Sequence, residues 1–183
     1  VLVTGPTALL PPKGIEVVSV STAEEMMKAL SARLAWATTV IMAAAVADFR
    51  PTRPASQKIR KQGRTGQTLE LERTTDILAS LSAQRTTQLM VGFAAETSDL
   101  IAHAKSKLTE KGLDLIVAND VTTLGGGFGS DQNAATLIDR QGGMTDLPLM
   151  PKRALADAIL NRAQELLRVR QSDQTSKLVR GSR

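Results

Sequence analysis

A carboxylate and a run of basic residues lie ten residues apart in this chain of 183 residues. Asp48 follows the apolar segment Ala43–Ala47, and the segment Lys58–Lys61 includes three cations. An apolar run that ends in one acidic residue is typical of a buried parallel strand, and open α/β sheets bind ligands where such strands end. A cationic loop beside that carboxylate suits a triphosphate and the negative charge that develops when it reacts.

The segment that holds the basic run reads as a loop. Residues 50–66 contain two prolines, two glycines and six basic residues, with few apolar side chains to anchor them. We expect a mobile flap that becomes ordered over bound nucleotide. Taken without further context, a basic run on a loop is more typical of a solvated surface patch.

The composition limits the chemistry that these residues can perform. The chain contains no cysteine and one histidine, His103. This composition excludes disulfides, thiolate zinc sites, a cysteine nucleophile and a multi-histidine metal site. We therefore expect a site that works with lysine, carboxylates, backbone amides and a bound cation. No apolar run is long enough to cross a membrane. Three phenylalanines and one tryptophan are too few for a surface that stacks several nucleic-acid bases.

The formal charge of +5 is unevenly distributed. Residues 168–183 hold five basic side chains and one acidic side chain, so this tail accounts for four of the five net charges. The polar composition of residues 169–183 is typical of a basic disordered tail, whereas residues 1–168 predict one globular domain. The pI of about 9.9 therefore says little about the domain and does not favour a nucleic-acid partner.

Elements that would position the carboxylate and the cations can be read from the hydrophobic pattern. Apolar runs and alternation predict strands at 1–3, 16–20, 38–47, 68–72, 88–95 and 113–118, and a hairpin of strands at 134–138 and 143–149. Helix signals predict helices at 23–36, 76–84, 98–111 and from 151 onward. This alternation predicts an α/β fold, a Rossmann-like doubly wound and mostly parallel sheet with a small β-hairpin extension. We expect the first strand and helix of such a fold to lie upstream of Val1.

Seven short blocks, taken in order, carry a resemblance to a known family. They are Val3–Pro6, Ala44–Arg50, Lys58–Lys61, Thr75–Leu78, Gly92–Thr97, Ala118–Val121 and Gly127–Asn133. From Val1 to about Leu167 the chain resembles the phosphopantothenate–cysteine ligases, also called phosphopantothenoylcysteine synthetases. Seven blocks in the right order and at the right spacing are far more specific than any one of them.

The resemblance implies an activity in coenzyme A biosynthesis, the ligation of 4′-phosphopantothenate to L-cysteine. Bacterial members use CTP: the pantothenate carboxylate attacks the α-phosphate, pyrophosphate leaves, and an acyl-cytidylate forms that the cysteine amine then attacks. Mg²⁺ is the implied cofactor, with its ligands left open. The resemblance also implies a homodimer in the cytoplasm, frequent fusion to a flavin-dependent phosphopantothenoylcysteine decarboxylase, and neither a nucleic-acid nor a membrane partner.

The resemblance also assigns site residues. Lys58 matches the active-site lysine of the flexible flap, where it would neutralise phosphate charge as the anhydride forms and collapses. The matched positions for binding of the nucleotide CTP are Met42, Ala43, Ala44, Asp48, Lys58, Thr75, Asp76, Ile77, Leu78, Phe93, Lys107 and Lys111.

Each of these assignments has a plainer alternative. Asp48 could instead cap the next turn, and Phe93 could pack in the core at a strand end. Lys107 and Lys111 are four residues apart and share a helix face, but charged helix faces are common. Thr74–Thr75 stands where the family has Asn-Pro, a departure from the family pattern just before the expected helix.

Family members have two further segments that match nothing in residues 1–183, Gly-Pro-Thr-Arg-Glu-Pro and Ser-Asn-x-Ser-Ser-Gly-Lys-Met-Gly. The second contributes phosphate-binding backbone at a helix start, so we expect the chain by itself to be impaired or inactive. Two other function classes stay open, an NAD(P)-binding Rossmann-type oxidoreductase and a nucleic-acid-binding domain. Against the oxidoreductase, no Gly-x-Gly-x-x-Gly follows a strand, and the glycine-rich run at 125–131 has a different order.

Overall fold

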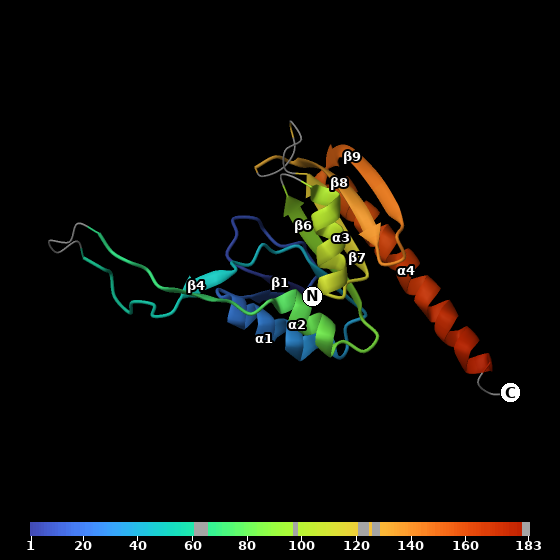
Figure 1. The fold of residues 1–183 in the computed structure, drawn as a ribbon, viewed down its shortest axis with the longest axis horizontal. Coiled ribbons are helices and arrows are strands. Elements are labelled where there is room, and N and C mark those ends of the chain that lie inside the picture. The colour runs from blue at the N-terminus through green and yellow to red at the C-terminus, as the bar shows by residue number, and fades with distance from the viewer. Residues whose placement is uncertain (61–65, 97–98, 121–124, 126–128, 181–183) are drawn as a thin grey trace.

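The structure is a computed structural model that describes residues 1–60, 66–96, 99–120, 125 and 129–180, with side chains described as far as 172. The strands are β1 (Leu2–Thr4), β2 (Val17–Ser19), β3 (Thr39–Met42), β4 (Phe49–Pro51), β5 (Leu71–Arg73), β6 (Leu89–Glu96), β7 (Leu115–Asp120), β8 (Gln132–Asp139) and β9 (Met144–Pro151). The helices are α1 (Ala23–Leu34), α2 (Ile77–Gln84), α3 (Leu100–Glu110) and α4 (Lys152–Arg180). Figure 1 shows a body of sheet and helices from which a long arm projects.

The main sheet has five strands in the order β3-β6-β7-β8-β9. β3, β6 and β7 are parallel, whereas β8 and β9 add an antiparallel hairpin at one side. This arrangement confirms the predicted α/β fold with a mostly parallel sheet and a hairpin extension. Because the parallel strands point the same way, Met42, Gly92 and Ile116 lie next to one another across the sheet.

Alternation along the strands divides the core into two layers. On one face, Met90 of β6 and Ile116 of β7 pack with α1, α2 and α3. On the other face, Val91 and Val117 pack against the buried side of α4. Strands that are apolar on both faces need helices on both sides, which is what the near-continuous apolar runs of β6 and β7 predict.

β1 and β2 form a separate parallel sheet of two strands. A cavity of about 700 Å³ lies between β1 and β3, and it is lined by apolar side chains that include Val3, Leu30, Val40 and Met42. Among the described residues no strand bridges the two sheets. A doubly wound sheet places a strand at this position, between the edges of β1 and β3.

β3 is shorter than the sequence predicts. The apolar run suggests a strand over 38–47, but β3 ends at Met42, and residues 43–47 are irregular and mostly exposed. Alanine is small, so an alanine run costs little when it faces solvent, and apolar composition alone did not reveal the exposure. Asp48 therefore follows an irregular segment rather than a strand end.

α4 continues beyond the predicted end of the domain. The composition predicts a disordered tail from residue 169, whereas the helix extends to Arg180. The side chain of Arg170 holds the first turn of α4 past residue 168 in place. Its guanidinium donates to the Gln88 carbonyl at 3.2 Å and forms an ion pair with Asp114. Asp114 is buried and also pairs with Arg85.

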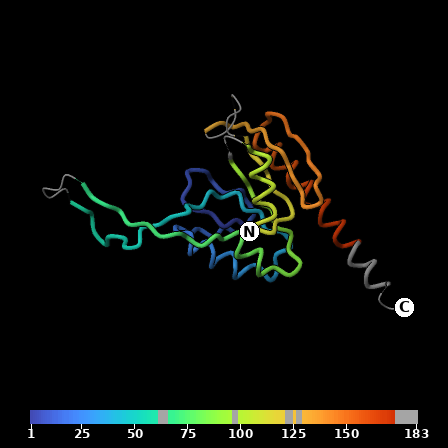
Figure 2. The backbone as a smooth tube through the Cα atoms, viewed as in Figure 1, coloured from blue at the N-terminus to red at the C-terminus, as the bar shows by residue number. Residues whose placement is uncertain are grey.

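The arm is built by β4 and β5, which pair antiparallel with Phe49 opposite Arg73 and Pro51 opposite Leu71. Figure 2 shows the two runs of chain leaving the body side by side. Residues 61–65 of the predicted flap lie outside the described residues, so the expectation that they order over nucleotide stays a prediction. The alternating residues 68–72 were expected to form a half-exposed strand, and β5 lies exposed at their end.

Candidate functional site

A pocket of about 140 Å³ opens at the end of β3, beside Phe93 of β6, and it gathers residues from four distant parts of the sequence. We call it the strand-end pocket. Nine of the twelve candidate nucleotide-binding residues line it: Met42, Ala44, Asp48, Thr75, Asp76, Ile77, Leu78, Phe93 and Lys111. The other lining residues, which sequence reasoning missed, are Val46, Ala47 and Thr74. A single small pocket thus unites positions that the sequence separates by as many as 69 residues.

The start of α2 forms one wall of the strand-end pocket. Asp76 caps the helix, since its Oδ1 accepts from the Ala79 amide at 3.0 Å. Ile77 and Leu78 are buried behind it and fasten the helix to the sheet. Gly92 of β6 allows this close approach, because a Cβ built there would lie 2.8 Å from Leu78 Cδ2 and 2.7 Å from a Leu113 methyl group.

Lys111, just past the end of α3, supplies the cation of the pocket. Its Nζ lies 2.9 Å from Asp76 Oδ2, and both side chains are partly exposed. Burial alone raises the pKa of Asp76, but hydrogen bonds from the Ala79 amide and from Lys111 outweigh it and hold that pKa below its ordinary value. The pair therefore places one positive and one negative group in the pocket, next to the N-terminus of α2.

Thr74 fixes the segment that forms the opposite wall. Its Oγ1 donates to the Ala47 carbonyl at 2.5 Å, and its amide donates to the Asp48 carbonyl at 2.9 Å. These bonds hold the irregular segment 44–48 against the start of α2. Thr74 stands where the family has the Asn of its Asn-Pro pair, and this departure was the signal that could have drawn attention to its hydroxyl.

The structure does not bring every candidate residue to the pocket. Ala43 lines the cavity between β1 and β3 instead. Lys107 is half-buried one turn before Lys111 on α3 and does not line the pocket. Lys58 lies in the part of the arm between β4 and β5 and does not line the pocket. The predicted role of Lys58 therefore requires the arm or a second copy of the chain to bring it to the nucleotide.

The order of strands and helices along the sequence also predicts that Asp48, Phe93 and Asn119 line one cleft near the carboxyl ends of neighbouring strands. Asp48 and Phe93 do line the strand-end pocket, whereas Asn119 does not. Asn119 lies on β7 opposite Ala95 of β6, and its Oδ1 is buried without a hydrogen-bond partner in the part of the chain that the structure describes. The expectation is therefore met for two of the three residues.

The described residues offer no cluster of three or more histidine, cysteine, aspartate or glutamate side chains that could hold a metal ion. The strand-end pocket has two carboxylates, Asp48 and Asp76, and Asp76 is already engaged by Lys111 and a helix amide. This donor set does not fit a dedicated metal cage. It does fit Mg²⁺ held mainly by nucleotide phosphates and water, with one or two protein carboxylates.

Comparison with known proteins identifies the class to which this fold and site belong. Residues 1–167 match the family described as the DNA/pantothenate metabolism flavoprotein C-terminal domain. The chain belongs to this family.

Among its relatives is the coenzyme A biosynthesis bifunctional protein CoaBC of Bacillus subtilis, which is 43% identical over 167 residues, covering 91% of this chain and 41% of that protein. The protein of the same name from Mycobacterium tuberculosis is 39% identical, with 87% of this chain and 41% of that protein covered. A crystal structure of the C-terminal domain of such a protein superposes with a TM-score of 0.76 at 36% identity, covering 91% of this chain and 74% of that one.

The chain spans about two fifths of the length of the curated relatives that it matches. Activities that belong to the whole of such proteins are therefore proposals for this one. In the described part of the chain, no helix has both the length and the apolar character that crossing a membrane requires.

Proposed function

We propose that this chain is the ligase part of a protein that joins 4′-phosphopantothenate to L-cysteine with CTP, in coenzyme A biosynthesis. The observation that supports the proposal best is that nine residues proposed to bind the nucleotide line a single pocket, the strand-end pocket. Membership of the family and the similarity to CoaBC proteins support the same reaction. An oxidoreductase or a nucleic-acid-binding domain has no comparable support.

In this proposal the pocket binds part of the nucleotide in the ground state. Lys111 would exchange its contact with Asp76 for a phosphate, and Lys107, one turn away, would meet the triphosphate further out. Asp48, an acceptor when ionised, suits ribose hydroxyls or an exocyclic amine. The small residues Ala44 and Ala47 leave room for a base or sugar to approach the backbone. A pocket of about 140 Å³ encloses only a part of such a molecule.

The chemistry needs no protein nucleophile. A carboxylate oxygen of the acid forms a bond to the α-phosphorus, and the bond to pyrophosphate breaks. The cysteine amine then attacks the acyl carbon, loses a proton, and CMP leaves with the electron pair of the broken C–O bond. Both steps place extra negative charge on phosphate oxygens, so electrostatic stabilisation and positioning supply the catalysis. Lys58 is our choice for the cation that follows this charge, because its flexible stem suits a moving target.

In this proposal Mg²⁺ would bind together with the triphosphate and would neutralise charge on the leaving pyrophosphate. We likewise propose a cytoplasmic protein in which a flavin-dependent phosphopantothenoylcysteine decarboxylase is fused to this chain. The bifunctional names of its relatives support the fusion.

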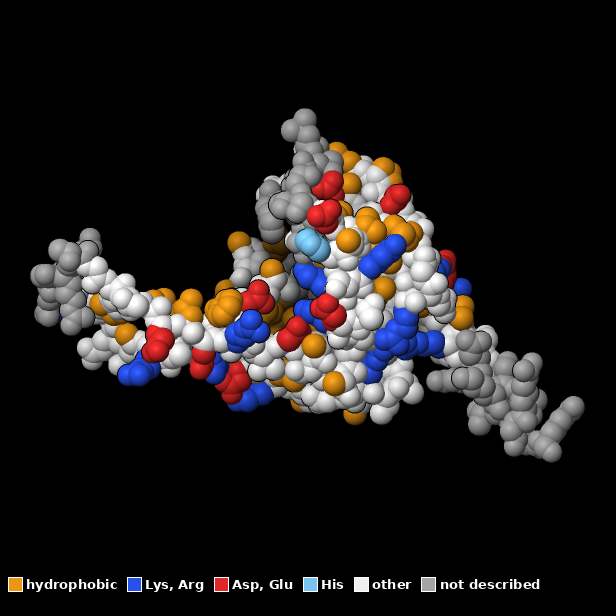
Figure 3. Space-filling model, in the orientation of Figure 1, with side chains coloured by type: hydrophobic (Ala, Val, Ile, Leu, Met, Phe, Trp, Pro, Cys, Tyr) orange, Lys and Arg blue, Asp and Glu red, His pale blue; other side chains and the backbone are white. Residues whose placement is uncertain are grey.

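A homodimer would cover the arm. Four large apolar side chains of the arm are at least half exposed: Phe49, Ile59, Leu69 and Leu71. Figure 3 shows apolar side chains spread along the arm, which stands apart from the body. Two strands without a core are marginally stable by themselves, so a second copy that packs on them would stabilise the arm and could bring Lys58 to a pocket.

The reaction itself tests the proposal. The full-length protein is incubated with CTP, 4′-phosphopantothenate, L-cysteine and Mg²⁺, and the products are measured by mass spectrometry. We expect 4′-phosphopantothenoylcysteine and CMP in equal amounts, with acyl-cytidylate accumulating when cysteine is omitted. Binding of NADPH without any turnover of CTP would contradict the proposal and favour the oxidoreductase. ATP and UTP serve as controls for the choice of nucleotide.

A further inference from the structure

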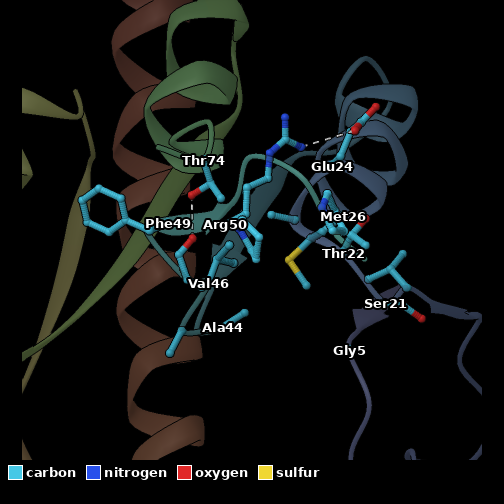
Figure 4. A pocket seen from close by; sticks show the side chains of 16 residues that line it. Gly5, Ser21, Thr22, Glu24, Met26, Ala44, Val46, Phe49, Arg50 and Thr74 are labelled. Carbon is cyan, nitrogen blue, oxygen red and sulfur yellow. Dashed lines mark hydrogen bonds and ion pairs between the residues drawn. The ribbon is translucent and has the colours of Figure 1, made fainter. Parts of the chain in front are cut away.

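Thr74 lies where the arm, the strand-end pocket and α2 meet. It follows the end of β5 and comes shortly before Asp76, which caps α2. Its amide donates to the Asp48 carbonyl at 2.9 Å, which continues the pairing of β4 with β5 toward the body. Its hydroxyl donates to the Ala47 carbonyl at 2.5 Å, the bond that Figure 4 draws as a dashed line beside Thr74. One residue thus joins the base of the arm to a wall of the pocket.

The wall that Thr74 contacts consists of residues 44–48, and we call it the wall segment. Its backbone is irregular, and its three alanines are exposed and have no side-chain atom beyond Cβ to hold them in place. Val46 is the residue of the segment that packs against the core. In the part of the chain that the structure describes, the hydrogen bonds that join the wall segment to another segment both come from Thr74. The position of the wall segment therefore depends on this threonine.

Asp48 and Lys111 line the strand-end pocket from different parts of the fold. Asp48 ends the wall segment, whereas Lys111 lies just past α3. In the proposed function Asp48 binds the ribose or the base, and Lys111 binds a phosphate. A nucleotide that contacts both residues needs them at a fixed separation, and a wall that is already in place loses less entropy when the nucleotide binds. A contact that fixes the wall segment therefore acts on nucleotide binding.

We propose that Thr74 is a positioning residue for the nucleoside half of the nucleotide, because its hydroxyl holds the wall segment where Asp48 can meet the ribose or the base. This inference rests on the proposed function. The triphosphate half is assigned to Lys107 and Lys111, which α3 and its C-terminal end place. Loss of the Thr74 hydroxyl should therefore weaken recognition of the nucleoside and leave recognition of the triphosphate unchanged.

The hydroxyl of Thr74 contributes position more than stability. Its bond to the Ala47 carbonyl is exposed, so water replaces the hydroxyl when the side chain is changed. The amide bond from Thr74 to Asp48 belongs to the backbone and remains, so the arm stays paired. What is lost is one neutral hydrogen bond, and the net contribution of such a bond corresponds to about a two- to tenfold change in an equilibrium constant.

The test compares CTP with inorganic triphosphate, which has the phosphate chain without the nucleoside. Binding of each is measured by calorimetry on the full-length protein with Mg²⁺. Thr74→Val keeps the shape of the side chain and removes the hydroxyl. For this variant we expect the affinity for CTP to fall about two- to tenfold, while inorganic triphosphate binds as it does to the unchanged protein. In steady-state ligation the KM for CTP should rise by the same factor, with kcat unchanged within about twofold.

A rescue variant and a matched control accompany this change. Thr74→Ser keeps a hydroxyl at the same position and should restore the affinity for CTP. Thr52→Val removes the hydroxyl of another half-buried threonine of the arm, which donates to the Glu70 carbonyl at 3.3 Å and does not line the strand-end pocket. We expect Thr52→Val to change neither affinity.

Several results would overturn the role of Thr74. Equal losses for CTP and inorganic triphosphate would show that Thr74→Val disturbs the whole pocket. Failure of Thr74→Ser to restore CTP binding, or an equal effect of Thr52→Val, would show that the hydroxyl does not position the wall segment. If Thr74→Val does not fold, Thr74→Ala removes the same hydroxyl and the same comparison applies. Ligation by the unchanged protein with no effect of Thr74→Val removes the positioning role alone, whereas absence of ligation with CTP removes the proposed function.

Discussion

The strand-end pocket and the arm present their candidate residues in opposite ways. The pocket is built on buried elements, with Ile77 2% exposed and Leu78 7% exposed behind its wall. The arm has Phe49 and Leu71 at 53% and 50% exposed and no core of its own. Residues that hold a nucleotide in its ground state gain from a rigid frame, whereas a lysine that follows charge through a reaction gains from a movable support. From this contrast we infer that the pocket binds the nucleotide and that the arm supplies the lysine for the chemical steps.

The largest effect that we expect on this contrast comes from Asp114, which supports the body. Its buried carboxylate accepts from the Met90 amide at 2.8 Å and pairs with Arg85 and Arg170. Asp114→Ala would leave the partly buried Arg85 without its anion and should cost about 3–5 kcal/mol of unfolding free energy. Urea unfolding measures this, with Asp157→Ala on the exposed side of α4 as a control that should change little. A loss no larger than that of the control would mean that the body does not depend on this ion cluster.

Lys58 on the arm provides the next test. If it stabilises charge that exists mainly in the transition state, Lys58→Gln in the full-length protein should slow the chemical steps more than it weakens nucleotide binding. Loss of one such contact costs about 2.7–4 kcal/mol in the barrier, or roughly 100- to 1,000-fold in rate. Single-turnover formation of the acyl-cytidylate is the measurement.

Lys107→Gln and Lys111→Gln are the matched changes on the body. They should act mainly through a higher KM for CTP, because a triphosphate contact is already made in the ground state. Small and equal effects from all three lysines would show that the arm lysine is only surface charge, and the division between pocket and arm would fail.

A pair of glycines sharpens the contrast at a smaller scale. Gly92→Ala would push a methyl group into Leu78 and Leu113 beneath the strand-end pocket. We expect a loss of about 1–3 kcal/mol in unfolding free energy, together with a higher KM for CTP because α2 must shift. Gly66→Ala on the arm, where no atom lies within 4 Å, should change neither quantity. The prediction would be contradicted if both variants had the same stability.

Sequence patterns predicted the parts of this molecule whose physics is local. The helix starting at residue 23 begins with a capping box made by Thr22 and Glu25, and Gly112, just past the end of α3, has a positive φ of 61°; both are local sequence signals. Apolar runs located β6 and β7 because strands covered on both faces need them. The residues of the strand-end pocket were named by resemblance, and the structure brings nine of them together without showing that they bind a nucleotide.

What the sequence did not reveal depends on contacts between distant residues. The pairing of β4 with β5 joins residues that are 20 to 24 positions apart, across a segment that reads only as a loop in the sequence. Arg170 lies in a polar stretch that reads as tail, and only the fold shows that Asp114 meets it. Thr74 looked like a departure from a motif until its bonds to Ala47 and Asp48 gave it a place in the wall.

The smallest effect that we expect concerns the ion pair between Asp76 and Lys111. The folded-state pKa of Asp76 is lowered, so the pair adds stability above the unfolded value of about 3.9, and this stability is lost as the pH falls through the folded pKa. Asp76→Asn keeps a good helix cap and removes the charge, so at pH 7 it should cost less than about 1 kcal/mol, since the pair is partly exposed. Unfolding curves from pH 7 to pH 2 should show the two proteins converging in the acid range. A difference that persists at pH 2 would mean that Asp76 acts through the shape of its cap, and the Lys111 contact would then cost a nucleotide nothing to displace.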